Sequence, residues 1–167
     1  MTQENATAVE LVLRPFEPRD RDGIIALIDG IFREYGDRAC IEKCDADLGD
    51  VASHYAPGRF MVLTDSADTV LGTAAIVEDN ERPGVFWLKR LYLHPSLRGT
   101  GSGERLLRWA IDTARAIGCT RMEFWSDTRF KRGHAFYAKH GFIRTDVVRT
   151  VDDGWEPYDE YFFFKEW

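Results

Sequence analysis

The sequence predicts one α+β domain built around a mixed β-sheet. Some stretches alternate apolar and polar residues as strands do, and others repeat apolar residues every three or four positions as helices do. Short connections rich in Gly, Pro and Asp join several strands and indicate antiparallel hairpins, whereas a glycine-rich loop leads from a strand into a helix. A chain of 167 residues can bury one core, and we find no linker or repeat in it. We therefore expect residues 1–167 to form a single domain, with residues 1–8 as a loose polar terminus.

The expected order of elements is β-α-α-β-β-β-α-β-α-β-β. Residues 9–14 alternate and predict a first strand that ends at Pro15. An apolar stripe closed by Gly36 predicts a helix over residues 20–35, and the pattern over residues 45–55 predicts a weaker helix. A three-stranded meander follows, over residues 59–64, 70–78 and 85–93.

The second half begins with the glycine-rich loop and a long helix. Residues 104–117 place their apolar side chains on one face, and Gly118 ends this helix. Asp152, Asp153 and Gly154 predict the last turn. The remaining elements are a strand, a short helix and two strands, over residues 121–125, 132–139, 142–151 and 158–165.

The composition indicates a globular protein that binds a small anion. The formal net charge of −6 argues against a general nucleic-acid binder. Between Arg82 and Arg108, however, six Lys or Arg residues face a single Glu, which favours a locally held anionic ligand. Three cysteines, no signal peptide and no long apolar run favour a reduced, cytoplasmic protein without a membrane segment. Cys40 and Cys44 have only His54 near them, so we expect ordinary thiols rather than a zinc site.

The loop Arg98-Gly-Thr-Gly-Ser-Gly103 stands where a strand leads into a helix. The first N–H groups of a helix lack intrahelical partners and lie at the positive end of its dipole, so a pyrophosphate could bind there. A nucleoside-triphosphate P-loop is excluded, because its glycine spacing and its Lys-Ser/Thr pair are missing. A dinucleotide loop and a nucleotide-dependent enzyme are disfavoured, because Glu104 replaces the third glycine and the preceding strand ends a meander. A ligand-free turn is the remaining alternative.

Two segments together resemble one known family. Residues 98–103 resemble the Arg/Gln-x-x-Gly-x-Gly/Ala signature of the GCN5-related N-acetyltransferases (GNAT), and Pro95 precedes them as in that family. Residues 134–142, His-Ala-Phe-Tyr-Ala-Lys-His-Gly-Phe, are similar to its second signature, a short helix with an aromatic-Tyr pair ending in Gly-Phe. The resemblance covers the chain from Leu11 to its end, and the predicted order of elements fits it.

The resemblance implies the GNAT fold and an acetyl-CoA-dependent N-acetyltransferase without a metal. The acetyl group would pass to a primary amine of a small molecule or peptide by direct attack in a ternary complex. The loop N–H groups would bind the pyrophosphate, and the backbone at the end of the preceding strand would pair with the pantetheine arm. The cofactor-binding residues implied are Leu91, Tyr92, Leu93, Arg98, Gly99, Thr100, Gly101, Ser102, Gly103, Phe130, Phe136 and Lys139.

The resemblance also implies a general acid. Tyr137 stands where many members have a tyrosine that protonates the leaving thiolate, although a tyrosine there could also be core. Two positions depart from the family: Phe130 replaces a common asparagine, and Trp87 replaces a common glutamate. These departures leave room for a different class of function, a non-catalytic acyl-CoA-binding regulatory module.

The general base must come from another carboxylate. Glu123 is the first candidate, Asp127 the second, and Glu78 a further one; each could instead be a solvated surface group. Cys119 is not expected to be a nucleophile, because no His lies near it in the sequence.

Two features of the sequence bear on the acyl acceptor. Acidic residues cluster after the first helix and suit a cationic amine, unless they are simply solvated. In the last strand, alternating aromatic residues make both faces apolar, so one face is core and the other is a pocket wall or a homodimer interface. The acidic residues are Glu34, Asp37, Glu42, Asp45, Asp47 and Asp50, and the aromatic ones are Tyr161, Phe162, Phe163 and Phe164.

Overall fold

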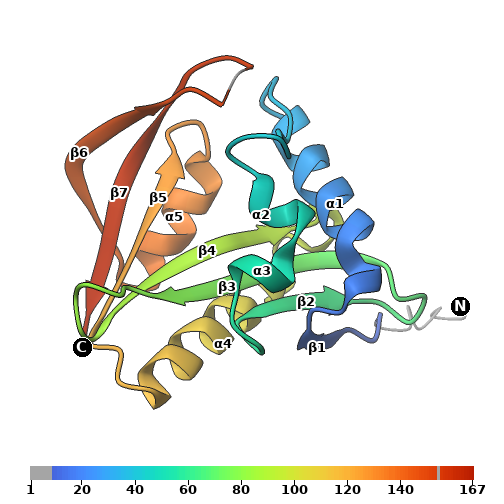
Figure 1. The fold of residues 1–167 in the computed structure, drawn as a ribbon, viewed down its shortest axis with the longest axis horizontal. Coiled ribbons are helices and arrows are strands. Elements are labelled where there is room, and N and C mark those ends of the chain that lie inside the picture. Colours follow the sequence, from blue (N-terminus) through green and yellow to red (C-terminus); the bar gives the residue numbers. More distant parts are fainter. Residues whose placement is uncertain (1–8, 154) are drawn as a thin grey trace, which may run out of the picture.

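The computed structural model describes residues 9–153 and 155–167, so the terminus expected over residues 1–8 and the turn residue Gly154 lie outside the described residues. Within them, one seven-stranded sheet runs in the order β1-β2-β3-β4-β5-β7-β6 (Figure 1). The strands are β1 Val12–Pro15, β2 Phe60–Thr64, β3 Val70–Glu78, β4 Val85–Leu93, β5 Arg121–Asp127, β6 Ile143–Val151 and β7 Tyr158–Glu166. The α-helices are α1 Arg21–Arg33, α2 Ala46–Gly49, α3 Val51–His54, α4 Ser102–Ala116 and α5 Lys131–Lys139. The predicted α+β mixed sheet is confirmed.

The elements follow the predicted order with two local differences. The weaker helix expected over residues 45–55 is two short helices, because Asp50 leaves the helical conformation between them and caps α3 through the Ser53 N–H. Strand β1 begins at Val12 and includes Pro15, which the sheet tolerates because β1 is an edge strand. Two short 3₁₀ turns, Pro18–Asp20 and Pro95–Leu97, precede α1 and the glycine loop.

The sheet opens between β4 and β5. These strands pair in parallel only from Val85 to Trp87 and from Arg121 to Glu123. Figure 1 shows them starting side by side and then spreading apart. All of β5 pairs with β7 instead, so the far half of β5 belongs to the β5-β7-β6 part of the sheet. The result is a V-shaped opening beyond Trp87 and Glu123.

Helices cover the two faces of the sheet and meet at this opening. On one face, α1 buries Ile24 and Ile28 against alternate residues of β2 and β3 such as Val62. On the other face, α4 buries Leu107 against Phe86 and other residues in a second cluster. This cluster also includes Phe124, Phe142 and Phe163 together with α5 residues Phe136 and Tyr137. The opening therefore lies between α1–α3 on one side and α4 and α5 on the other. No helix among the described residues is long and apolar enough to cross a membrane.

Candidate active site

The glycine loop adopts a conformation that favours glycine. Gly99 and Gly101 have φ of +77° and +86°, in the left-handed region, and α4 starts directly afterwards at Ser102. A Cβ at either glycine would meet no atom within 4 Å. The space above the loop is thus open, and the glycines are required by the backbone turn.

The loop presents N–H groups to that open space. The Thr100 N–H is bonded to the Leu97 carbonyl, and the Thr100 and Ser102 hydroxyls lie 2.9 Å apart. In the described part of the chain, nothing accepts the N–H of Ser102 or Gly103, the first residues of α4. Because the positive end of the helix dipole lies at the same place, the loop is suited to an anion.

The charged side chains around the loop are mostly occupied. Both Nη2 contacts of Arg98 go to Glu34, at 2.8 and 3.1 Å, and Arg105 donates to the Leu11 carbonyl. Lys139 is exposed at the end of α5. Phe136 lies beside the loop, since a Cβ at Gly103 would be 3.7 Å from its ring. In this structure, the attraction for an anion therefore comes chiefly from the backbone of the loop.

Strand β4 contains a bulge before it reaches the loop. Its register with β3 shifts between Thr73 and Ala75, and Arg90 has a φ of +54°, which is unusual for a residue with a side chain. The Thr73 hydroxyl donates to the Arg90 carbonyl at 2.6 Å and holds the bulge in place. Beyond it, Leu91 packs toward α4 whereas Tyr92 packs toward α1.

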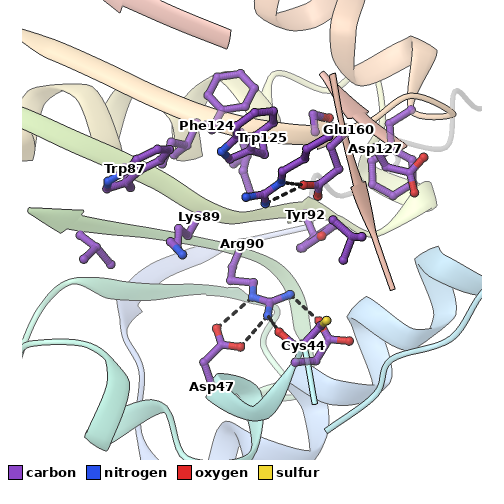
Figure 2. Close-up of a pocket in the computed structure, with 18 of the residues that line it drawn as sticks. Cys44, Asp47, Trp87, Lys89, Arg90, Tyr92, Phe124, Trp125, Asp127 and Glu160 are labelled. Atoms are coloured by element: carbon purple, nitrogen blue, oxygen red, sulfur yellow. Dashed lines mark hydrogen bonds and ion pairs between the residues drawn. The ribbon is translucent and has the colours of Figure 1, made fainter. Parts of the chain in front are cut away.

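A cavity of about 960 Å³ lies at the opening of the sheet. Its lining comes from α1, the α2 and α3 region, β4, β5 and β7, and includes Leu91, Phe124 and Tyr137 from the α5 side. Figure 2 shows that β4 contributes Trp87, Lys89, Arg90 and Tyr92 to the cavity wall. The cavity thus connects the two faces of the sheet through the gap between β4 and β5.

Arg90 organises one wall of the cavity. Its guanidinium binds Asp47 at 2.5 and 2.9 Å and Asp45 at 2.8 Å (Figure 2). Burial alone would raise the pKa of Asp47, but hydrogen bonds from Arg90 and Tyr55 lower it overall. Burial and the nearby Asp47 raise the pKa of Tyr55. Part of the predicted acidic cluster is therefore a structural network in the cavity wall.

A second network of ion pairs lies at the C-terminal end of β5. Arg129 binds Asp127 at 2.6 Å and Asp37 at 2.9 Å, and also donates to the Tyr35 carbonyl. The rings of Phe130 and Tyr35 pack in a tilted arrangement, with their centroids 4.8 Å apart. Asp127 lines the cavity as the predicted second candidate for the base, but this arginine holds its carboxylate.

Tyr137 reaches the cavity from the α5 side. Its ring packs on Phe124 at 4.3 Å, and burial raises its pKa, so the phenol stays protonated at neutral pH. Among the described residues, its hydroxyl has no hydrogen-bond partner and no side-chain oxygen is both buried and unsatisfied. The hydroxyl therefore faces the open space of the cavity.

Glu123 lies elsewhere. The residue is 1% exposed and does not line the cavity, and its carboxylate binds Arg82 at 2.7 and 3.0 Å and Arg121 at 2.6 Å. Burial raises the pKa of this carboxyl, but the two arginines lower it overall, which disfavours proton uptake. These contacts support a structural role rather than the predicted general base. Glu78 lines the cavity and is exposed.

The cysteines show no arrangement for covalent chemistry. Cys119 is buried and its thiol donates to the Arg121 carbonyl. Cys40 and Cys44 are free thiols, and Cys44 lines the cavity. The described residues contain no cluster of three or more His, Cys, Asp or Glu that could hold a metal.

Sequence reasoning missed several cavity residues, among them Lys89, Arg90 and Trp125. Lys89 could have been found, because it lies two residues after Trp87 and so shares its face of the strand. The role of Arg90 depends on the bulge, which no short-range pattern predicts. The predicted second apolar face of β7 supports the cavity, since Phe162 packs under Trp125 at 5.0 Å and under Trp87 at 6.4 Å.

Comparison with known proteins agrees with this geometry. An IAA acetyltransferase of Azospirillum brasilense is 33% identical over 123 residues, which cover 73% of this chain and 78% of that protein. An uncharacterized N-acetyltransferase of Schizosaccharomyces pombe is 28% identical, covering 77% of this chain and 80% of the other. A mycothiol acetyltransferase of Stackebrandtia nassauensis is 27% identical over 75% of this chain but only 40% of its own length.

Solved structures share the fold. An acetyltransferase of the GNAT family from Staphylococcus aureus superposes with a TM-score of 0.79 at 16% identity, covering 94% of this chain and 99% of that one. An acetyltransferase from Streptococcus agalactiae gives 0.77 at 21% identity, covering 94% and 98%. The profile of the acetyltransferase (GNAT) family matches residues 24–142. With the glycine loop, the opened sheet and the second signature all in place, this chain belongs to the GNAT family of N-acetyltransferases.

Proposed function

We propose that this protein transfers an acetyl group from acetyl-CoA to a primary amine of a small molecule or peptide, by direct attack in a ternary complex. The observation that carries the proposal is the V-shaped opening beyond Trp87 and Glu123. The glycine loop lies on the α4 side of this opening, an acidic and aromatic cavity lies on the other, and Tyr137 stands between them. Donor and acceptor can then approach from opposite faces of the sheet.

The donor would lie along the loop and the end of β4. Backbone N–H groups of the loop, chiefly those of Ser102 and Gly103, would hold the pyrophosphate at the start of α4, with the Thr100 and Ser102 hydroxyls shaping the turn. Because β5 has left β4 beyond Trp87, the backbone of Leu91, Tyr92 and Leu93 is open on that side to the pantetheine arm. Phe136 would line the path beside Gly103, and Lys139, exposed at the end of α5, would support the phosphates.

The chemistry follows from where the cavity residues lie. The neutral amine attacks the thioester carbonyl, the C–N bond forms, and the C–S bond breaks. The Tyr137 hydroxyl, which burial keeps protonated until this step and which faces the cavity, then gives its proton to the leaving thiolate. The proton lost by the amine leaves through the open cavity, where Glu78 is a lining carboxylate without a basic partner among the described residues.

The names of the relatives do not select one acceptor. One relative is named an IAA acetyltransferase and another a mycothiol acetyltransferase, and these names refer to different compounds. The acceptor of this chain must therefore be sought from its own cavity, whose aromatic lining suits an amine with an apolar or planar body.

A two-step experiment tests the proposal. Acetyl-CoA should raise the melting temperature of the protein, whereas NAD and ATP should not; stabilisation by NAD alone contradicts the proposal. A panel of primary amines is then screened for CoA release by thiol detection, and at least one should release CoA stoichiometrically with its N-acetyl product. Binding of acetyl-CoA with no CoA release from any amine class supports a non-catalytic acyl-CoA-binding module instead.

A further inference from the structure

Strand β4 places a lysine in the cavity wall. Lys89 and Trp87 share one face of the strand because they are two residues apart, and both line the cavity. In the described part of the chain, no carboxylate or hydrogen-bond acceptor contacts Lys89 Nζ. Figure 2 shows its side chain between Trp87 and Trp125 on one side and Arg90 on the other. A cation is therefore held in the cavity without a partner from the protein.

The other charged side chains along this wall take part in ion pairs. Asp45 and Asp47 bind Arg90, and Glu160 binds Arg149 at 2.6 and 2.7 Å. The remaining unpaired charges of the lining lie on loops or at the end of a strand rather than inside β4; they are Lys43, Glu78 and Glu81. Water reaches Lys89 because the cavity is open, yet burial and the adjacent Arg90 together lower its pKa. An anion within hydrogen-bond distance of Lys89 would stabilise its charged ammonium form.

Arg149 can serve as a second donor to the same anion. Both of its contacts to Glu160, from Nε and Nη2, go to one carboxylate oxygen, Oε2. Its guanidinium lies 4.3 Å over the ring of Trp125, which fixes its plane along the cavity wall. Within the described residues, its Nη1 is left without a partner.

We propose that the acyl acceptor carries a carboxylate near its amine, as amino acids do, and that Lys89 binds this carboxylate with help from Arg149. This inference rests on the proposed function. Lys89 lies just past Trp87, where pairing between β4 and β5 ends, and two residues before Leu91. A carboxylate on Lys89 therefore leaves an amine a few bonds away free to enter the gap. Trp87 and Trp125, both supported by Phe162, would pack on an apolar or aromatic side chain of the acceptor.

The first test measures binding without catalysis. Phenylacetate and phenylacetamide have the same shape but differ in charge, and each is titrated into the protein saturated with CoA. The wild-type protein should bind phenylacetate at least about tenfold more tightly than phenylacetamide. Lys89→Met should remove this preference by weakening phenylacetate alone, and Lys89→Arg should restore most of it. Lys131→Met, which removes an exposed lysine of α5 outside the cavity lining, is the matched control and should keep the preference.

The second test uses turnover with matched amines. Tyrosine and tryptophan should be acetylated with a higher kcat/KM than tyramine and tryptamine, which lack the carboxylate, and Lys89→Met should narrow this ratio. Equal binding of the two phenyl probes, no binding of phenylacetate, or an equal loss in Lys131→Met each overturns the inference. If amines without a carboxylate release CoA as well as their acidic partners, the inference fails while the proposed function stands. If no amine releases CoA, the proposed function fails, and phenylacetate binding still reports on Lys89.

Discussion

Tyr137 combines two properties at the level of a single residue. Its ring is packed among Phe124, Phe142 and Phe163, which fixes its position, while its hydroxyl faces the cavity. Removing that hydroxyl in Tyr137→Phe keeps the packing and deletes the proton donor. We expect kcat to fall by about 10²-fold, with the KM for acetyl-CoA changed less than about twofold. Steady-state kinetics check this, and equal turnover in the variant removes the general-acid role.

Glu123 is expected to behave in the opposite way. Its carboxylate joins Arg82 and Arg121 but does not reach the cavity. Glu123→Gln should lower stability by about 1 to 2 kcal/mol, a modest loss because both arginines are partly exposed and can be hydrated. The acid limb of the pH–rate profile should remain where it is. If that limb vanishes together with most of kcat while the melting temperature is unchanged, Glu123 is the base after all.

At the level of elements, substitutions in the glycine loop can distinguish a glycine that only the backbone conformation requires from one that ligand binding also requires. Gly101 and Gly58 both have positive φ, of +86° and +74°, and both have open space where a Cβ would stand. An alanine should cost about 1 kcal/mol of stability at either position, because the left-handed conformation disfavours a side chain. Only Gly101→Ala, and more strongly Gly101→Asp, should weaken acetyl-CoA binding in a titration. A similar loss of affinity in Gly58→Ala contradicts the assignment of the loop.

The same scale shows what the sequence could predict. The α4 helix and the β2-β3-β4 meander could be predicted, because the apolar pattern of each element extends over many residues and the connections between the strands are short. The split of the helix expected over residues 45–55 was not, since it depends on Asp50 turning away to cap α3. The glycine loop and Tyr137 could be predicted because they lie in the two signatures shared with the family. The wall around Arg90 could not be predicted, because it joins residues more than forty positions apart through a bulge that tertiary contacts hold.

At the scale of the whole molecule, arginine–carboxylate networks tie distant segments together around the cavity. Arg90 joins β4 to the α2 region, and Arg129 joins the end of β5 to the segment after α1. Away from the cavity, Arg14 binds Asp20 beside the edge strand β1. The Arg90 and Arg129 networks bring together elements on either side of the opening of the sheet. The stability of the fold should therefore depend on the ionisation of these carboxylates.

The sign of that dependence follows from their pKa values. Burial raises the pKa values of Asp20, Asp29, Asp47 and Glu123, but their hydrogen bonds and the nearby arginine charges together lower these values in the folded state. A depressed folded pKa gives stability that is fully present above the unfolded pKa, about 4, and is lost as pH falls through the folded pKa. The melting temperature should therefore fall steeply as pH drops below about 4.

His134 should add a smaller fall in melting temperature, which begins at a higher pH. Burial lowers its pKa, so the folded protein resists protonation that the unfolded chain accepts below about pH 6.5. Its Nε2 lies 3.1 Å from the Ser126 hydroxyl, a contact that His134→Gln can keep. Melting curves between pH 8 and pH 2 should show both declines in the wild-type protein and only the one below pH 4 in His134→Gln. A melting temperature that stays constant down to pH 2 would mean that the arginine networks contribute nothing to the fold, because protonating their carboxylates must remove whatever stability they provide.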